Sequence, residues 1–425
     1  MSQKFETLAL HAGYDRTNGF GTCAVPLNRT SAYHFRDTKH ASDLFHLKEL
    51  GNIYSRLQNP TQDVLEQRIA ALEGGAAAVA LSSGTSAIFY AIINIAKAGD
   101  EIVSTSNLYG GTFTMFNNIL PDLGIKVHIV ENGDYEGLKA VINEKTRAVY
   151  TETIGNPSLN FADIRAYADI AHENQLPLIV DSTFTPPAIY KPIDDGADIV
   201  VHSLTKWIGG HGVGVGGIVV DSGKFDWSIP KFSLFNEPEA SYQNLRFAHD
   251  LGDLTPIAFA LRLRLVPLRN LGAAIAPDNA WMFLQGVETL SLRMERHCEN
   301  ALKVAKYLKN HNSVEWVNYP GLEGDESYEL ASKKLTKGAG GMVVFEVKGG
   351  RDAGEKFIES LELFSHVANV GDAKSLAIHP SSTTHSQLNE EAQKKGGITP
   401  GLIRLSIGIE NIDDILADLD SALKA

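Results

Sequence analysis

Short apolar runs alternate with longer amphipathic stretches through the first half of the chain. Seven of these runs, each of five or six residues, have the composition of buried strands, and most are separated by enough residues for a crossover helix. They span residues 76–81, 101–105, 125–130, 147–151, 177–181, 198–202 and 217–221. Because strands that alternate with helices form parallel sheets covered on both faces, the pattern predicts an α/β fold with a mostly parallel, seven-stranded sheet.

The first helix of this pattern carries signals at both of its ends. Asn59 is a suitable N-cap, Pro60 fits the first helical position, and Gln62 can return a hydrogen bond to the cap. Apolar residues then recur every three or four positions until Gly74. We therefore expect a helix between Asn59 and Gly74.

The alternation stops after residue 221. The segment 224–269 mixes proline, aromatic and charged residues without a period, so no secondary structure is predicted for it. Helical spacing returns at 287–310, and 341–347 and 402–407 are candidate strands. These elements predict a second, smaller α+β domain in the C-terminal part.

Composition and charge narrow the class of protein. Hydrophobic residues make up 44% and charged residues 21% of the 425 residues, as in ordinary folded proteins, and the net charge of −13 disfavours nucleic acids and anionic membranes. The longest apolar stretch has about half the length of a membrane span. The first residues lack a secretory signal, and the 2 cysteines form no metal-binding or disulfide pattern. We expect a cytoplasmic protein without a metal.

A lysine follows the sixth predicted strand and stands just behind two hydroxyl side chains. The residues from His202 to Lys206 read His-Ser-Leu-Thr-Lys and lie where open α/β sheets place their ligands. An uncharged lysine amine can bond covalently to an aldehyde, and neighbouring hydroxyl groups can bind a phosphate. Pyridoxal phosphate (PLP) requires both features. A solvated surface lysine is the alternative, so other residues have to support this interpretation.

Two further groups support a cofactor site at this edge of the sheet. Asp181 ends an apolar strand, so its charge needs a partner. The protonated nitrogen of a pyridine ring would be such a partner, and a protonated ring withdraws electrons from a substrate carbanion. A helix cap or an arginine are the alternatives for Asp181. The turn 82–86, Ser-Ser-Gly-Thr-Ser, precedes a helix, where free N–H groups favour phosphate, although an ordinary N-cap has the same pattern.

The glycine run 212–217 formally matches the dinucleotide-binding pattern G-x-G-x-x-G. That pattern should follow a strand and open a helix, whereas here it precedes a predicted strand. We interpret the run as a tight connection after Lys206, with a nicotinamide-dependent oxidoreductase as the alternative function. The 14 histidines form no metal-binding motif, and none is assigned a catalytic role.

The segment from His202 to Lys206, followed by Trp-Ile-Gly-Gly-His-Gly up to Gly212, resembles the Cys/Met-metabolism family of PLP enzymes, which includes cystathionine synthases and lyases. The resemblance covers essentially the whole chain through the segments 8–13, 52–56, 152–157 and 402–414. It is greatest to the O-acetylhomoserine sulfhydrylases of this family, because of the segments 234–238, 286–297 and 224–269.

The resemblance implies fold type I of the PLP-dependent transferases. The expected parts are an N-terminal arm over 1–57 that contributes to a neighbouring subunit, a PLP-binding α/β domain over 58–270 and a C-terminal α+β domain over 271–425. Because the arm is shared, the active unit should be at least a dimer, and a homotetramer is expected.

The resemblance also implies roles for individual residues. Lys206 would hold the cofactor covalently, Asp181 would meet the ring nitrogen, and Tyr109 would stack on the ring. The phosphate would be bound by Ser83, Gly84, Thr85, Ser203 and Thr205, and by Tyr54 and Arg56 of a neighbouring subunit. Sulfhydrylases of the family often carry Gln in place of Thr85, so backbone contacts are expected there. The substrate carboxylate would be bound by Arg404, Ser375 and Asn156. Without the resemblance, a surface ion pair would be the preferred interpretation of Arg404.

These roles imply a γ-replacement reaction, in which O-acetyl-L-homoserine and sulfide give L-homocysteine and acetate. Lys206, aided by Tyr109, would move the α- and β-protons of the substrate. O-succinylhomoserine sulfhydrylase, cystathionine γ-synthase and γ-lyase activities use the same machinery and are the nearest alternatives. A non-catalytic binding protein is disfavoured, because Lys206, Asp181 and Arg404 occur together.

Overall fold

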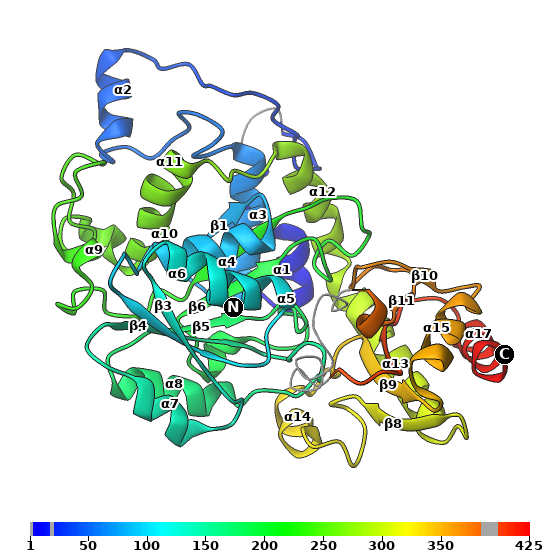
Figure 1. Ribbon diagram of the computed structural model, residues 1–425. Coiled ribbons are helices and arrows are strands. Elements are labelled where there is room, and N and C mark those ends of the chain that lie inside the picture. The colour runs from blue at the N-terminus through cyan, green and yellow to red at the C-terminus, as the bar shows by residue number, and fades with distance from the viewer. Residues whose placement is uncertain (1–2, 18–20, 384–397) are drawn as a thin grey trace.

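The computed structural model describes residues 3–17, 21–383 and 398–425. A seven-stranded sheet forms the larger part of the molecule, and a five-stranded sheet lies in the C-terminal part (Figure 1). The strands of the larger sheet are β1 Ala77–Leu81, β2 Glu101–Thr105, β3 Lys126–Val130, β4 Thr146–Glu152, β5 Leu178–Asp181, β6 Ile199–Ser203 and β7 Gly217–Asp221. All seven predicted strands are confirmed, with ends that differ by at most one residue from the expected ranges.

The larger sheet is mixed, and not parallel throughout. Its order is β1-β7-β6-β5-β4-β2-β3, and β7 runs antiparallel to β1 and β6 while the other pairings are parallel. The connection 204–216 forms turns instead of a crossover helix, so it returns the chain in the opposite direction. As a result, the carboxyl ends of β1 to β6 and the amino end of β7 meet at one edge.

Helices cover both faces of this sheet, and each face has its own buried core (Figure 1). One face is covered by α1 Phe5–His11, α3 Pro60–Glu73, α7 Tyr135–Val141 and α8 Ile164–Glu173. The other face is covered by α4 Gly84–Ile93, α5 Gly110–Thr114, the π-helical turn Met115–Ile119 and α6 Leu120–Asp122. The N-terminal segment adds α2 Thr38–Phe45, and a 3-10 turn spans Pro192–Asp195.

Helix α3 begins and ends as predicted, but one of its expected capping bonds is wrong. The Asn59 side chain accepts from the Thr61 N–H, Pro60 is the first helical residue, and Gly74 ends the helix with a φ of 78°. Gln62 does not reach back to the cap. It is buried, and its Nε2 donates to the carbonyl oxygen of Ile275, so it ties α3 to the segment before α12.

The segment without a predicted structure contains short helical elements. They are α9 Ser233–Asn236, a 3-10 turn Gly252–Ile257, α10 Ala258–Leu263, a π-helical turn Arg264–Leu268 and α11 Arg269–Leu271. Pro256 and Pro267 lie inside two of them, and the π-helical turn departs from the helical period of 3.6 residues. The elements are therefore too short and too irregular to produce a readable pattern, and they pack beside α4 on one face of the sheet (Figure 1).

The glycine run 212–217 leads directly into β7 and opens no helix. It therefore lacks the strand-to-helix context of a dinucleotide-binding turn, as its place in the sequence predicts. Among the described residues, no helix is both long and apolar enough to span a membrane.

The C-terminal part contains helices and a sheet of order β10-β11-β12-β9-β8. Its strands are β8 Val314–Asn318, β9 Met342–Val347, β10 Ser365–His366, β11 Leu376–Ile378 and β12 Leu402–Ser406. Its helices include α12 Pro277–Glu288, α13 Leu290–Lys309, α14 Tyr328–Lys334, α15 Gly350–Glu359 and α17 Ile412–Lys424, with a 3-10 turn at Pro380–Ser382. Buried residues of this sheet continue the core that α3 and α8 form, so the division into domains at residue 270 stays a prediction.

Candidate active site

The connection after β6 carries Lys206 to the edge where the carboxyl ends of the parallel strands meet. The Lys206 side chain is half-buried, and its Nζ donates to Oδ1 of Asn369 at 2.6 Å. Burial and, to a smaller extent, the positive charge of Arg404 together lower the pKa of the Lys206 amine to about 8. The amine is therefore partly uncharged near neutral pH, which is the form that bonds to an aldehyde.

Arg404 reaches the same place from the C-terminal sheet. It lies on β12 and is 8% exposed, and its Nη1 donates to Oδ1 of Asn156 at 3.2 Å. Among the described residues, this is the one hydrogen bond that the guanidinium group forms. Burial lowers the pKa of Arg404 to about 10. A guanidinium group with most of its donors free can bind a carboxylate through two parallel hydrogen bonds.

Two carboxyl groups lie side by side at the ends of β4 and β5. Glu152 and Asp181 are neighbours in the strand register, and both are buried. Burial raises the pKa of Asp181, although hydrogen bonds from Thr183, including one from its N–H at 2.9 Å, counteract the rise. Burial and the adjacent Asp181 raise the pKa of Glu152 well above its usual value. Asp181 is therefore the carboxyl group of the pair that ionises more readily.

The amino end of α4 packs directly against the end of β6. Ser83 caps this helix by accepting from the Ser86 N–H at 3.0 Å. A Cβ atom on Gly84 would lie 2.7 Å from Cβ of Ser203, so only glycine allows this approach. The first N–H groups of α4 have no partner inside the helix, and they lie beside the hydroxyl group of Ser203. Such a cradle fits a phosphate group.

Thr205 and Tyr109 complete this edge of the site. The Thr205 hydroxyl accepts from the Gly216 N–H at 3.1 Å, which holds the connection after β6 against the strand that follows. Tyr109 precedes α5 and is 50% exposed, and its backbone N–H donates to Oε1 of Glu152 at 2.7 Å. A Cβ atom on Gly111 would lie 2.5 Å from the Tyr109 ring, so this glycine makes room for the ring.

The remaining expected site residues are placed less directly. Ser375 is buried, and its hydroxyl donates to Glu410 at 2.9 Å while accepting from the Gly408 N–H. The Arg56 guanidinium lies 5.3 Å from the centre of the Tyr54 ring, which is exposed. Within the described chain, neither Tyr54 nor Arg56 forms a hydrogen bond with the residues around Lys206. Their roles stay predictions, as does a direct contact between Ser375 and the substrate.

Sequence reasoning missed three residues that contact the predicted ones. Asn369 accepts from Lys206, Thr183 links Asp181 to the Ser203 N–H through its backbone and its hydroxyl, and Glu152 binds Tyr109. Glu152 could have been found, because it ends a buried strand just as Asp181 does. Asn369 has no comparable signal, since it lies in a loop that only the tertiary fold brings to Lys206.

Comparison with known proteins identifies the family. The family described as Cys/Met metabolism PLP-dependent enzyme matches residues 6–424. The chain belongs to this family. The O-acetyl-L-homoserine sulfhydrylase of Leptospira meyeri is 54% identical over 99% of this chain and 97% of its own length. The homocysteine synthase of Schizosaccharomyces pombe is 52% identical over 100% of this chain and 99% of its own length.

A solved structure extends this comparison to the cofactor of the Cys/Met metabolism family. The crystal structure of a Campylobacter jejuni protein assigned as an O-acetylhomoserine (thiol)-lyase has a TM-score of 0.95, is 41% identical and matches 100% of both chains. It contains a pyridoxyl-lysine phosphate residue. The residues of the present chain fit the same group, because a half-buried lysine of lowered pKa, a buried carboxyl group and a phosphate cradle meet at one edge.

Proposed function

We propose that this chain is a PLP-dependent sulfhydrylase that converts O-acetyl-L-homoserine and sulfide to L-homocysteine and acetate. The observation that carries the proposal is the meeting of Lys206 and Arg404 at one buried edge. There an amine of lowered pKa lies beside a guanidinium group whose other donors have no partner among the described residues. Relatives of nearly equal length, named as O-acetyl-L-homoserine sulfhydrylases and homocysteine synthases, support the choice of reaction.

Each expected cofactor residue has a place in this proposal. Lys206 would hold PLP covalently, Asp181 would pair with its ring nitrogen, and Tyr109 would pack against its ring. Its phosphate would be held by Ser83, Gly84, Thr85, Ser203 and Thr205. When bound, PLP supplies an electron sink for the negative charge that forms at the α-carbon of the substrate. Asp181 serves this chemistry because, of the two adjacent carboxyl groups, it ionises more readily.

The protein's own residues position the substrate and move its protons. Arg404 and Asn156 hold the substrate carboxylate, together with Ser375 on the neighbouring segment. Nη1 of Arg404 and Oδ1 of Asn156 lie 3.2 Å apart. Once freed as an amine, Lys206 Nζ takes the α-proton and then, with Tyr109, moves a β-proton. The bond from the γ-carbon to the ester oxygen breaks and acetate leaves. The sulfur of hydrosulfide then bonds to the γ-carbon, and the returned protons give homocysteine.

The proposed active unit contains at least two copies of the chain, and the expected assembly is a homotetramer in the cytoplasm. Tyr54 and Arg56 lie together on an exposed part of the N-terminal segment, where they are available to a second copy. In the proposal they complete the phosphate site of that neighbour.

A paired-substrate assay tests the reaction. The purified enzyme is given O-acetyl- or O-succinyl-L-homoserine, each with sulfide or cysteine, and the products are separated and quantified. The expected main reaction is homocysteine formation from the acetyl ester and sulfide. Cystathionine as the main product, or a preference for the succinyl ester, would show that one of the related activities is the correct one.

A further inference from the structure

Glu152 is a buried acid that the proposed reaction does not use. It is the last residue of β4 and is 8% exposed, and its Oε1 accepts the backbone N–H of Tyr109 at 2.7 Å. Tyr109 immediately precedes α5, so its N–H has no partner within that helix. The carboxyl group of Glu152 therefore anchors the backbone of Tyr109 to the end of β4.

The residues that follow Tyr109 in the chain do little to fix the orientation of its ring. Tyr109 is 50% exposed, and Gly110 and Gly111 follow it without side chains that could support the ring. The ring also lies beside Gly111, where a Cβ atom would be 2.5 Å away. The direction of the ring consequently depends on where its backbone is held. The Tyr109 carbonyl oxygen accepts the Phe113 N–H at 2.9 Å within α5, and the Tyr109 N–H is held by Glu152.

The neighbour of Glu152 determines the form in which it can act. Asp181 lies directly across the parallel pair of β4 and β5, and both carboxyl groups are buried. Two adjacent buried carboxyl groups do not both ionise easily, because their charges repel in a medium of low dielectric. Asp181 receives hydrogen bonds from Thr183, whereas Glu152 receives one from Tyr109, and burial raises the pKa of Glu152 well above its usual value.

We propose that Glu152 is a positioning residue for Tyr109: it accepts the Tyr109 backbone N–H as an uncharged acid, holds the ring over the cofactor site and leaves the single negative charge on Asp181. The inference rests on the proposed function, because that function assigns Tyr109 to the cofactor ring. It adds a residue that contacts neither the cofactor nor the substrate. This residue determines how well Tyr109 contacts the cofactor ring.

The test is a double-mutant cycle on cofactor affinity. The apoproteins of the native chain, Glu152→Ala, Tyr109→Ala and the double variant are titrated with PLP, and the dissociation constants are obtained from protein fluorescence. We expect Glu152→Ala to weaken binding about tenfold, the worth of one buried hydrogen bond to an acid. In the Tyr109→Ala background the same change should have almost no effect, because no ring remains to be positioned.

Two conservative variants test whether Glu152 acts as an uncharged acceptor and whether the length of its side chain matters. Glu152→Gln keeps an uncharged acceptor of the same length, so its dissociation constant should stay within about threefold of the native value. Glu152→Asp keeps a carboxyl group but withdraws it by one carbon atom, so it should behave like Glu152→Ala. Glu152→Asp also preserves the test if the alanine variant does not fold.

Asp221 provides a matched control at the opposite edge of the sheet. It is also a buried acid at the end of a strand, and it accepts the N–H groups of Gly223 at 2.9 Å and Ala260 at 3.1 Å. Asp221→Asn should lower the temperature of unfolding without changing the affinity for PLP.

The outcomes distinguish the inference from the function on which it rests. Additive effects of Glu152→Ala and Tyr109→Ala would overturn the positioning role alone. If Glu152→Gln lost as much affinity for PLP as Glu152→Ala, the uncharged form of Glu152 would be overturned. If Tyr109→Ala itself left the affinity for PLP unchanged, the assignment of Tyr109 to the cofactor ring would be wrong, and the inference would fail with it.

Discussion

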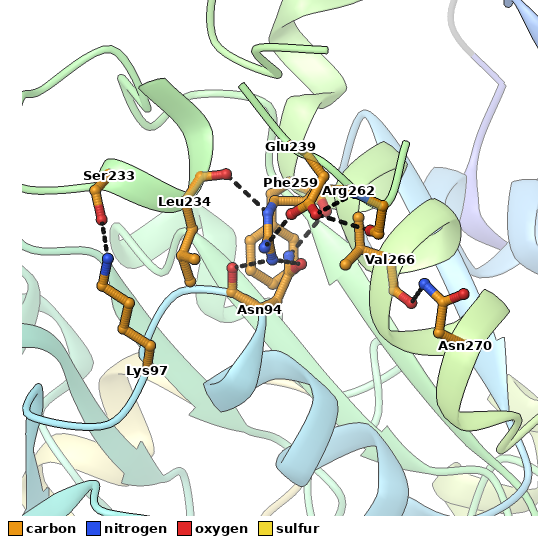
Figure 2. A network of polar contacts seen from close by, with 10 residues as sticks. Asn94, Lys97, Ser233, Leu234, Glu239, Phe259, Arg262, Val266 and Asn270 are labelled. Atoms are coloured by element: carbon orange, nitrogen blue, oxygen red, sulfur yellow. Dashed lines mark hydrogen bonds and ion pairs between the residues drawn. The ribbon is translucent and has the colours of Figure 1, made fainter. Parts of the chain in front are cut away.

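Two buried arginines show how differently this protein uses a buried charge. Arg262 lies in α10 beside α4 and is 3% exposed, and Figure 2 shows it surrounded by acceptors from separate segments. It donates to the carbonyl oxygens of Leu234 and Asn94, to the Asn94 side chain and to Glu239, at 2.8 to 3.1 Å. Arg404 is nearly as buried, yet among the described residues it donates only to Asn156.

The difference separates structural charges from functional ones. A buried charge with a full set of acceptors holds elements together, and Arg262 joins the irregular segment after β7 to the end of α4. A buried charge with free donors is costly unless something else fills them, so it indicates a ligand site. We expect substitutions of Arg262 to act mainly on stability and substitutions around Arg404 to act mainly on catalysis.

The largest effect is expected at Lys206. Lys206→Ala removes the amine that holds PLP and moves the substrate protons, so turnover should fall by about a thousandfold or more. Reduction of the native holoenzyme with borohydride, followed by mass spectrometry, should place the cofactor on the peptide that contains Lys206. A variant that retains turnover, or a label on another peptide, would contradict the assignment.

The next effect compares the two arginines directly. Arg404→Gln should lower kcat/KM for O-acetyl-L-homoserine about 100-fold, because the substrate carboxylate loses its charged partner, with little change in the unfolding temperature. Arg262→Gln should lower the free energy of unfolding by about 3 kcal/mol, because Glu239 and several carbonyl oxygens lose their donor, while the folded fraction keeps its activity. Steady-state kinetics and thermal unfolding of both variants measure the two effects.

Equal losses of stability in the two variants would contradict the distinction between the arginines. Retention of full kcat/KM in Arg404→Gln would contradict the substrate role. Because both changes remove one guanidinium group from a buried position, each variant serves as the control for the other.

The sequence predicts the parts of the molecule that follow regular patterns. Strands of a sheet that is covered on both faces are continuous apolar runs, so β1 to β7 could be located. The polar residues Asp181 and Lys206 stand out where such runs end. The surroundings of Arg262 could not be predicted, because a π-helical turn and internal prolines remove the helical period. Asn369 could not be predicted either, because its contact with Lys206 spans 163 positions of the chain.

A smaller effect concerns the pH dependence of Lys206. Its pKa is lowered to about 8, chiefly by burial and secondarily by Arg404, so the uncharged amine of the apoprotein becomes populated as the pH rises through about 8. The rate at which PLP bonds to the apoprotein should therefore rise with pH around that value. In Arg404→Gln the midpoint should move upward, because one of the two causes of the lowering is removed.

The measurement is stopped-flow absorbance of PLP addition to the apoprotein between pH 6 and pH 10, values chosen to bracket the expected midpoint and the ordinary range of lysine. Arg262→Gln is the control, since it removes a guanidinium group that does not act on Lys206. A midpoint near the ordinary value for lysine in the native apoprotein would contradict the effect of burial. An unchanged midpoint in Arg404→Gln would contradict the contribution of Arg404 to the lowered pKa of Lys206.

The smallest effect is expected at Thr85. It tests whether only buried polar groups with free donors, such as Arg404, indicate a ligand site. The Thr85 side chain is exposed, so water can satisfy its hydroxyl group, and the backbone of the first turn of α4 supplies the N–H groups for the phosphate. Thr85→Ala should change the dissociation constant of PLP by less than about threefold. Gly84→Ala is the contrasting change, because its Cβ atom would lie 2.7 Å from Cβ of Ser203 and force α4 away from β6. If Thr85→Ala lost as much affinity for PLP as Gly84→Ala, the Thr85 hydroxyl group would itself bind the phosphate. Exposed polar groups would then have to be considered, as well as buried ones with free donors, when a ligand site is identified.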